Sequence, residues 1–208
     1  MALRSYRQHC SLARALDLVG ERWTLLLMRD LCCGPQRYGE LLAGLPGIGT
    51  NLLAARLKTL AAEGLIEKGE AGEYALTAAG RELEPALVAL ARFGAARLGE
   101  PKEGELWRAL WTPLAMKAAF RPECSVGIDD EYEFRIDDEV FWVRVRGGAA
   151  TTGGGHAKLP DFVLTAGGQA LLALANRALT PGELVEREDV EFVGALPALE
   201  RCARLFAR

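Results

Sequence analysis

The sequence predicts an α+β protein of two domains, a helical N-terminal domain that ends in a β-hairpin and a C-terminal domain of a sheet with helices. Three observations predict this class. Apolar residues recur at helical spacing in the first half, and period-two alternation marks residues 131–145. Between the regions of helical and period-two spacing, residues 99–105 form a short charged segment with Gly and Pro. We therefore expect domains at 1–98 and 106–208, joined by a linker at 99–105, which suits a chain of 208 residues.

The first elements are four helices. Residues 11–19 and 22–32 read as helices separated by Gly20, and residues 36–42 read as a short helix. Pro and Gly in residues 44–47 then break the helical pattern. A longer helix follows, since Leu53, Leu57 and Leu60 share one face and Gly64 stands just past its end.

A hairpin and a long helix complete the N-terminal domain. Residues 65–68 and 74–76 predict two short strands around a turn at 69–73. Residues 77–98 predict one long helix with an apolar stripe at Leu83, Leu87, Leu90 and Phe93. Such a stripe needs a covering partner, and the simplest partner is a second copy of the chain. We therefore expect a homodimer.

The order of short helix, turn, longer helix and hairpin is that of a winged helix-turn-helix, which places one helix in the DNA major groove. The chain here resembles the HxlR-type regulators, relatives of the MarR group, over residues 8–98. In that family the N-terminal segment and the long helix form the homodimer interface. The matching segments are Gly20 to Thr24, Arg37 to Leu41, Arg56 to Leu60, Glu63 to Ile66, Tyr74 to Gly80 and Phe93-Gly94.

Double-stranded DNA is thus the expected partner. The outward face of the recognition helix carries Thr50, Asn51, Ala54, Ala55 and Lys58. The family tends to have polar residues where Ala54 and Ala55 stand, so this helix has few side chains that can form hydrogen bonds to bases. Base contacts would therefore rest on Asn51, to adenine, and on Lys58, to guanine or phosphate. An ordinary solvated helix face is the alternative interpretation.

The resemblance also implies phosphate contacts from Arg37, Arg56 and Lys68. For Arg56, an internal salt bridge with Glu40 or Glu63 is an equal alternative. The wing tip at residues 69–73 is acidic, so we do not expect it to enter a minor groove.

Charge and composition bound the function. The net charge is −3, but residues 1–66 hold eight Lys or Arg against five Asp or Glu, so basic charge gathers around the helix-turn-helix. The sequence lacks an apolar run long enough to span a membrane and a signal-peptide pattern. Five scattered cysteines without metal-ligand spacing fit a reduced, cytoplasmic protein without cofactor or metal.

The second half predicts alternating helices and strands. Residues 105–120 read as a helix that Pro113 kinks or splits, and residues 132–136 and 141–145 read as strands around an Asp137-Asp138 turn. Residues 147–155, rich in Gly, Ala and Thr, predict a mobile loop. A strand at 161–165, a helix at 169–179, a strand at 190–194 and a helix at 196–206 follow.

This half resembles a sterol-carrier-protein-type-2-like domain, on the strength of the hairpin, Pro160 to Thr165, Ala170 to Leu174, Leu179 to Gly182 and Val193-Gly194. The resemblance implies room for a hydrophobic small-molecule effector. Apolar side chains on one sheet face either pack solidly or line a pocket. The candidate ligand-binding residues are Trp107, Trp111, Tyr132, Phe134, Phe141 and Val143.

Three functions remain open. The favoured one is a dimeric transcriptional regulator whose C-terminal domain binds an effector or stabilises the dimer. The second is a thiol-based sensor acting through Cys10, which stands just before the first helix, where the family often has a cysteine and where a thiolate is favoured. The third is an enzyme or lipid-transfer protein fused to a DNA-binding domain. The sequence shows no catalytic constellation, so we do not expect an enzyme.

Overall fold

The computed structural model describes residues 5–99 and 102–206, and these fall into two compact units that divide between Leu87 and Val88. Each unit is described by itself. The division falls inside a helix and earlier in the chain than the predicted linker at 99–105, of which residues 100–101 lie outside the described residues. The predicted domain limits stay a prediction.

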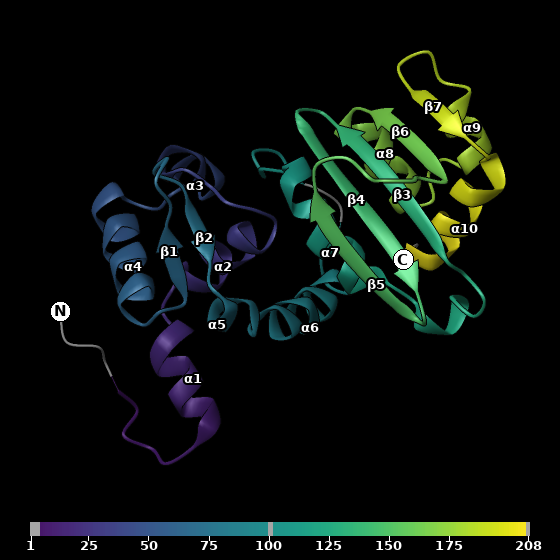
Figure 1. Cartoon of the computed structure of the whole chain (residues 1–208). Coiled ribbons are helices and arrows are strands. Elements are labelled where there is room, and N and C mark those ends of the chain that lie inside the picture. The colour runs from purple at the N-terminus through teal and green to yellow at the C-terminus, as the bar shows by residue number, and fades with distance from the viewer. Residues whose placement is uncertain (1–4, 100–101, 207–208) are drawn as a thin grey trace. The chain divides into compact units, whose positions relative to one another are not determined.

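The N-terminal unit has the predicted winged helix-turn-helix order. Its elements are α1 (Ser11–Val19), α2 (Thr24–Cys32), α3 (Tyr38–Gly44), α4 (Thr50–Ala62), β1 (Ile66–Lys68), β2 (Tyr74–Leu76) and α5 (Ala78–Arg81), all labelled in Figure 1. Leu53, Leu57 and Leu60 of α4 are buried, which confirms the predicted inward face. Gly64 follows α4 with a φ of +69°, the left-handed conformation that suits glycine past a helix end.

The predicted single helix over 77–98 is wrong. The structure has α5, a turn at residues 82–83, and α6 (Glu84–Ala95). Pro85 explains the break, because proline lacks the N–H that a continuous helix would need there and is favoured in a first turn. Gly80 permits close packing before the break, since a Cβ on it would meet the Leu65 carbonyl oxygen at 2.0 Å.

The C-terminal unit is a mixed five-stranded sheet with helices. Its strands are β3 (Asp130–Ile136), β4 (Glu139–Arg146), β5 (Ala149–Gly154), β6 (Phe162–Ala166) and β7 (Glu191–Gly194), in the order β5-β4-β3-β6-β7. Strand β4 pairs antiparallel with both β3 and β5. Strand β6 is parallel to β3, and β7 is antiparallel to β6. The helices are the 3₁₀ turns η1 (Ala109–Trp111) and η2 (Pro122–Cys124), with α7 (Thr112–Ala119), α8 (Gly168–Ala175), α9 (Pro181–Val185) and α10 (Leu196–Phe206).

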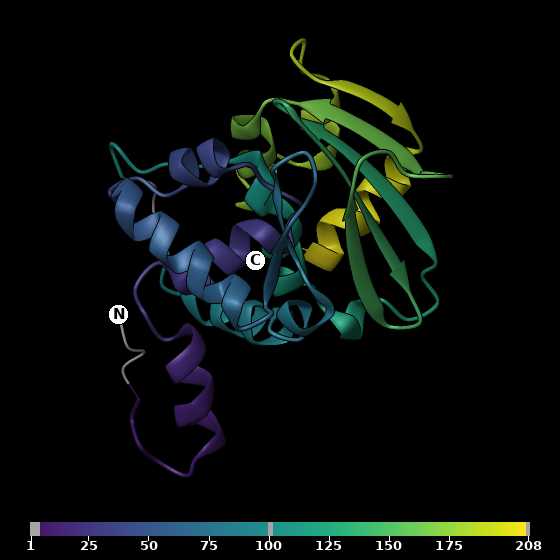
Figure 2. The same cartoon turned by 60° about the vertical axis from the view of Figure 1, so that its left-hand side comes forward.

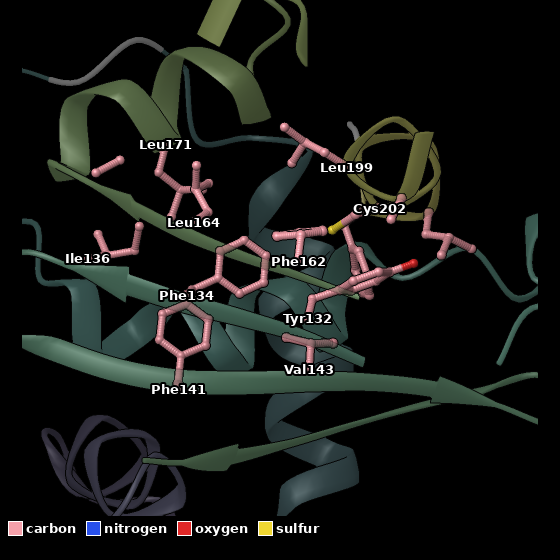
Figure 3. Close-up of a cluster of buried hydrophobic side chains, with 14 of the residues drawn as sticks. Tyr132, Phe134, Ile136, Phe141, Val143, Phe162, Leu164, Leu171, Leu199 and Cys202 are labelled. Carbon is pink, nitrogen blue, oxygen red and sulfur yellow. The ribbon is translucent and has the colours of Figure 1, made fainter. Parts of the chain in front are cut away.

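The predicted alternation on β3 and β4 is confirmed. Tyr132 lies opposite Val143 and Phe134 opposite Phe141, so these side chains share one face of the sheet. Figure 3 shows them, with Phe162 and Leu164 of β6, directed toward Leu171 on α8 and Leu199 on α10. Figure 2 shows α10 beside this face of the sheet. The core of the C-terminal unit is therefore sheet against α8 and α10.

One prediction about this unit is confirmed in part and another is wrong. The helical segment predicted over 105–120 is split as predicted, into η1 and α7, with Pro113 in the first turn of α7, but residues 105–108 precede both elements. Residues 147–155 are not a loop, because Gly147 and Gly148 make a tight turn with φ of +58° and +79° and the chain returns as β5. Position 153 has room only for glycine, because a Cβ there would clash with the Trp142 ring.

Candidate nucleic-acid interface

The local sequence positions α4 against α3. The Arg37 backbone N–H donates to the Glu40 carboxylate, which caps the start of α3. Leu41 and Leu45 are buried at its end, and the chain turns through Gly47, which has a φ of +93°. The Tyr38 hydroxyl then donates to the Thr50 carbonyl oxygen at 2.8 Å. This bond ties the first residue of α4 to the first residue of α3.

The outward face of α4 is free of the core. All five side chains predicted to face DNA are exposed, namely Thr50, Asn51, Ala54, Ala55 and Lys58, and Leu52 of the same helix is exposed as well. The two alanines keep this face narrow between Asn51 and Lys58, as close approach in a major groove requires. The structure thus brings these residues together on one helix face, and their contact with DNA stays a prediction.

The predicted phosphate-binding residues have different surroundings. Arg37 and Lys68 are exposed, and the Lys68 ammonium lies 5.6 Å from the Tyr74 ring centroid. Arg56 is in an internal salt bridge, but with neither of the predicted partners, since its Nη2 lies 2.8 Å from Glu21 Oε2. The alternative of an internal salt bridge for Arg56 is therefore confirmed, but the predicted partners Glu40 and Glu63 are wrong.

The wing is short and acidic, as predicted. Strands β1 and β2 pair from Ile66–Leu76 to Lys68–Tyr74, and the Gly69 N–H donates to the Glu73 carbonyl oxygen to close the turn. A further bridge joins Gln36 to Tyr74 and fixes the base of the wing beside the start of α3. Lys68, at the end of β1, is the exposed cation that the wing offers.

The predicted ligand-binding residues of the sheet form part of the core. Tyr132, Phe134, Phe141 and Val143 have exposed fractions of 0 to 3%. Their rings stack on neighbours, with centroids 5.1 Å apart for Phe134 and Phe141 and 4.9 Å apart for Tyr132 and Phe162. The sheet face is therefore filled by side chains of its own domain.

Trp107 and Trp111 do not lie on a helix that covers this face. Trp107 precedes η1 and packs partly against the core, where its ring lies over Gly168. Trp111 is partly buried at the end of η1. A surface hollow of about 490 Å³ lies between residues 122–129 and the β4–β5 turn, and none of the six candidate residues lines it.

Buried polar groups in the C-terminal unit serve the fold. The Tyr132 hydroxyl donates to Asp130 Oδ2, and burial, with the neighbouring Cys202 and Asp130, raises the pKa of Tyr132. Burial opposes ionisation of Glu133, but hydrogen bonds from His156, Arg135 and the Ala157 N–H together hold its pKa below the usual range. Glu133 thereby fastens the β5–β6 connection to the sheet.

Cys10 lies directly before the first helix, as predicted. It is the residue before α1, and it is exposed. Tyr6, Gln8, Leu12, Ala13 and Leu16 surround it in a hollow of about 220 Å³. Within residues 5–99 and 102–206, no group of three or more metal-ligating side chains gathers, and no helix is long and apolar enough to cross a membrane.

Comparison with known proteins identifies the N-terminal unit. Residues 18–102 match the HxlR-like helix-turn-helix family. An HTH-type transcriptional regulator of Synechocystis sp. is 37% identical over 91 residues, which cover 41% of this chain and 67% of that protein. This chain belongs to the HxlR-like family.

Two further relatives extend the comparison. An HTH-type transcriptional regulator of Mycobacterium bovis is 43% identical to this HxlR-like chain over 98 residues, and the chain spans 61% of its length. The crystal structure of PA1607, described as a transcription factor, has 37% identity and a TM-score of 0.42, and the alignment covers 49% of this chain and 75% of that one. The family match ends at residue 102 and leaves the role of the C-terminal unit to proposal.

Sequence reasoning missed two residues of the HxlR-like unit that act on α4. Tyr38 and Glu21 both stand in segments that carry the family resemblance, but helical spacing gives neither a role. Tyr38 acts through a backbone carbonyl, and Glu21 acts on a residue 35 positions away. Only the folded chain shows such contacts.

Proposed function

We propose that this protein is a DNA-binding transcriptional regulator that acts as a homodimer on an inverted-repeat operator. The observation that carries the proposal is the exposed face of α4, on which Asn51 and Lys58 flank two alanines. Asn51 reads adenine, Lys58 reads guanine or phosphate, and Arg37 and Lys68 contact phosphates on either side. The names of the HxlR-like relatives support the same function.

Exposed apolar side chains support the dimer. On α1, Leu12 is 66% exposed and Leu16 is 37% exposed. On α6, Leu90 and Phe93 are 51% and 61% exposed. Side chains of this size on successive helical turns form stripes that a partner surface covers. A two-fold dimer presents two recognition helices, so its half-sites lie about one turn of DNA apart.

Selection from random-sequence duplex DNA tests the proposal. The purified full chain is expected to enrich an inverted repeat, and sedimentation at micromolar concentration is expected to show a dimer. Enrichment of no motif contradicts DNA recognition. A monomer in sedimentation, or a single half-site in the selected DNA, contradicts the symmetric dimer.

The C-terminal unit has two proposed roles, and the packing favours one of them. A filled sheet face supports a domain that stabilises the dimer rather than one that holds an effector at this face. A sterol-carrier-like unit with a hydrophobic effector would have to open the packed face. Native mass spectrometry of the purified chain separates the two roles, because a retained small molecule supports the effector and dimers without added mass support the stabilising role.

A thiol sensor is the second candidate function. The observation that favours it is the exposure of Cys10 directly before α1, beside Leu12 and Leu16 on the surface proposed to pair. Oxidation there would alter the dimer and so the spacing of the recognition helices. Loss of DNA binding after treatment with diamide in the wild-type chain, absent in Cys10→Ser, supports this role. Equal responses of the two proteins contradict it.

A further inference from the structure

The first turn of the recognition helix α4 is exposed. Residues 49–52 are all exposed, and Leu53 is the first buried residue of the helix. Gly49 stands at the N-cap position, where it has no side chain to cap the first turn, and residues 50–53 include no Asp or Glu. A helix start without such a cap is weakly held. The turn that carries Asn51 therefore depends on other contacts for its position.

The connection between α3 and α4 gives this turn little support. Gly44, Gly47 and Gly49 stand close together in it, and glycine restricts the backbone less than any other residue. The last buried side chain before α4 is that of Ile48, which is 7% exposed. Packing therefore holds the chain at Ile48 and again at Leu53, and the residues between these two are exposed.

A hydrogen bond from α3 reaches this exposed turn. The Tyr38 hydroxyl donates to the Thr50 carbonyl oxygen at 2.8 Å. In the helix the same carbonyl accepts from the Ala54 N–H, and a carbonyl oxygen has two lone pairs, so it can accept both bonds. The donor is itself well placed, because Tyr38 is half-buried and the Glu40 carboxylate caps the start of α3. Tyr38 thus ties the first turn of α4 to an anchored helix.

The same bond joins the two kinds of DNA contact that the proposed function assigns. Arg37, the proposed phosphate contact, directly precedes Tyr38, and Asn51, the proposed base contact, directly follows Thr50. Phosphate contacts orient a protein on the duplex, and base contacts read the sequence. A bidentate pair between asparagine and adenine needs two well-aligned hydrogen bonds at once. The placement of this turn relative to α3 therefore decides whether Asn51 meets the base edge while Arg37 contacts the backbone.

We propose that Tyr38 determines sequence specificity, because its hydroxyl holds the first turn of α4 in the place from which Asn51 pairs with adenine. The inference rests on the proposed function and names the residue that sets its base readout. Tyr38 is a positioning residue, since it acts on DNA through Asn51. Loss of the hydroxyl frees the turn and lowers discrimination at one base pair, while the phosphate contacts and the other base contacts stay in place.

The test compares Tyr38→Phe with wild type on the selected duplex and on duplexes that differ from it at single base pairs. The base pair that Asn51 reads is the one at which Asn51→Ala loses its preference. Wild type is expected to prefer the selected base there by about 5- to 150-fold. Tyr38→Phe keeps the ring and is expected to retain severalfold less of this preference, with discrimination at the other base pairs unchanged. Tyr74→Phe, which removes a hydroxyl from the wing, is the matched control and is expected to follow wild type.

A double variant shows whether Tyr38 acts through Asn51. Tyr38→Phe/Asn51→Ala is expected to bind as weakly as Asn51→Ala, because the hydroxyl has no effect once the side chain that it positions is gone. Losses that add up in the double variant indicate an independent contact with the duplex and overturn the inference. An equal loss of affinity at every base pair in Tyr38→Phe, or the same loss of discrimination in Tyr74→Phe, overturns it as well.

A second measurement separates this inference from the proposed function. Amide hydrogen exchange of the free full chain, followed by NMR, needs no DNA. The Ala54 amide, which bonds to the carbonyl that Tyr38 holds, is expected to exchange severalfold faster in Tyr38→Phe than in wild type and in Tyr74→Phe. The amide of Leu60, near the end of α4, is expected to keep its rate.

Each outcome of the exchange measurement decides a different point. An unchanged rate at Ala54 overturns the positioning role whether or not DNA binds. Equal acceleration at Ala54 and Leu60 shows a general loss of stability and overturns the role too. Faster exchange at Ala54 alone, in a protein that selects no DNA motif, confirms the contact and overturns both the proposed function and the base readout that rests on it.

Discussion

In the N-terminal unit the side chains predicted to bind lie on an exposed helix face, whereas four of those predicted for the C-terminal sheet are the core itself. Asn51 and Lys58 are exposed, and Phe134 and Val143 are at most 1% exposed. Both sets belong to periodic sequence patterns. A polar residue on the side of a helix opposite its apolar stripe faces outward, but an apolar residue on a sheet face meets whatever covers it.

The comparison shows that sequence periodicity predicts which face of a helix or strand is buried, but not which groups pack against that face. On α4 the leucine face packs into the small winged domain, and the opposite face is exposed. On β3 and β4 the buried face could enclose a ligand or packed side chains with the same sequence pattern. The face is packed because side chains of α8 and α10, which follow much later in the chain, lie against it.

The largest expected effect is at the centre of the packed sheet. Phe134→Ala should lower the free energy of unfolding by about 3–5 kcal/mol, because it removes a buried ring that contacts Phe141 and Phe162. Urea unfolding measures it, with exposed Val193→Ala as a control that should change little. A loss below about 1 kcal/mol for Phe134→Ala would show that the face is not packed.

The next effect belongs to the exposed helix. Asn51→Ala and Lys58→Ala should each weaken binding to the selected DNA by about 1–3 kcal/mol without altering the free energy of unfolding. Fluorescence anisotropy measures the affinity. Lys158→Ala, which removes an exposed cation from the C-terminal unit, should leave it near wild type. Wild-type affinity in both α4 variants would show that α4 is not the recognition helix.

A smaller effect sharpens the description of β5. Gly153→Ala should cost about 1 kcal/mol, because its Cβ would displace the Trp142 ring. Gly154→Ala is the matched control, since its Cβ would meet nothing within 4 Å on the same strand. Thermal unfolding of both variants gives the comparison. Equal melting temperatures would contradict the packing of Trp142 over the strand and favour the predicted loop.

The smallest effect concerns pH. The pKa of Glu133 is lowered from 4.5 in the folded chain, so its ionised form stabilises the fold above that pH. This contribution should disappear as the pH falls through the lower folded-state value. Glu133→Gln should therefore lose less stability than wild type between about pH 5 and pH 3. Exposed Glu191→Gln should follow wild type, and parallel curves for all three would contradict the role of Glu133.

Much of the fold could be predicted from the sequence because local rules suffice for it. The apolar spacing of α4, the glycine after it, and the alternation on β3 and β4 each depend on residues close together in the chain. The exposed positions of Asn51, Lys58 and Cys10 follow from the same rules. The break before α6 was also local, and Pro85 was the signal that could have revealed it.

What only the tertiary structure decided depends on contacts between distant residues. Glu21 reaches Arg56 across 35 positions, and β5 becomes a strand because β4 pairs with it despite a composition typical of loops. The sheet face is filled because α8 and α10 return to it late in the chain. Local periodicity states which side chains are turned inward, but the neighbours that they meet depend on the path of the whole backbone.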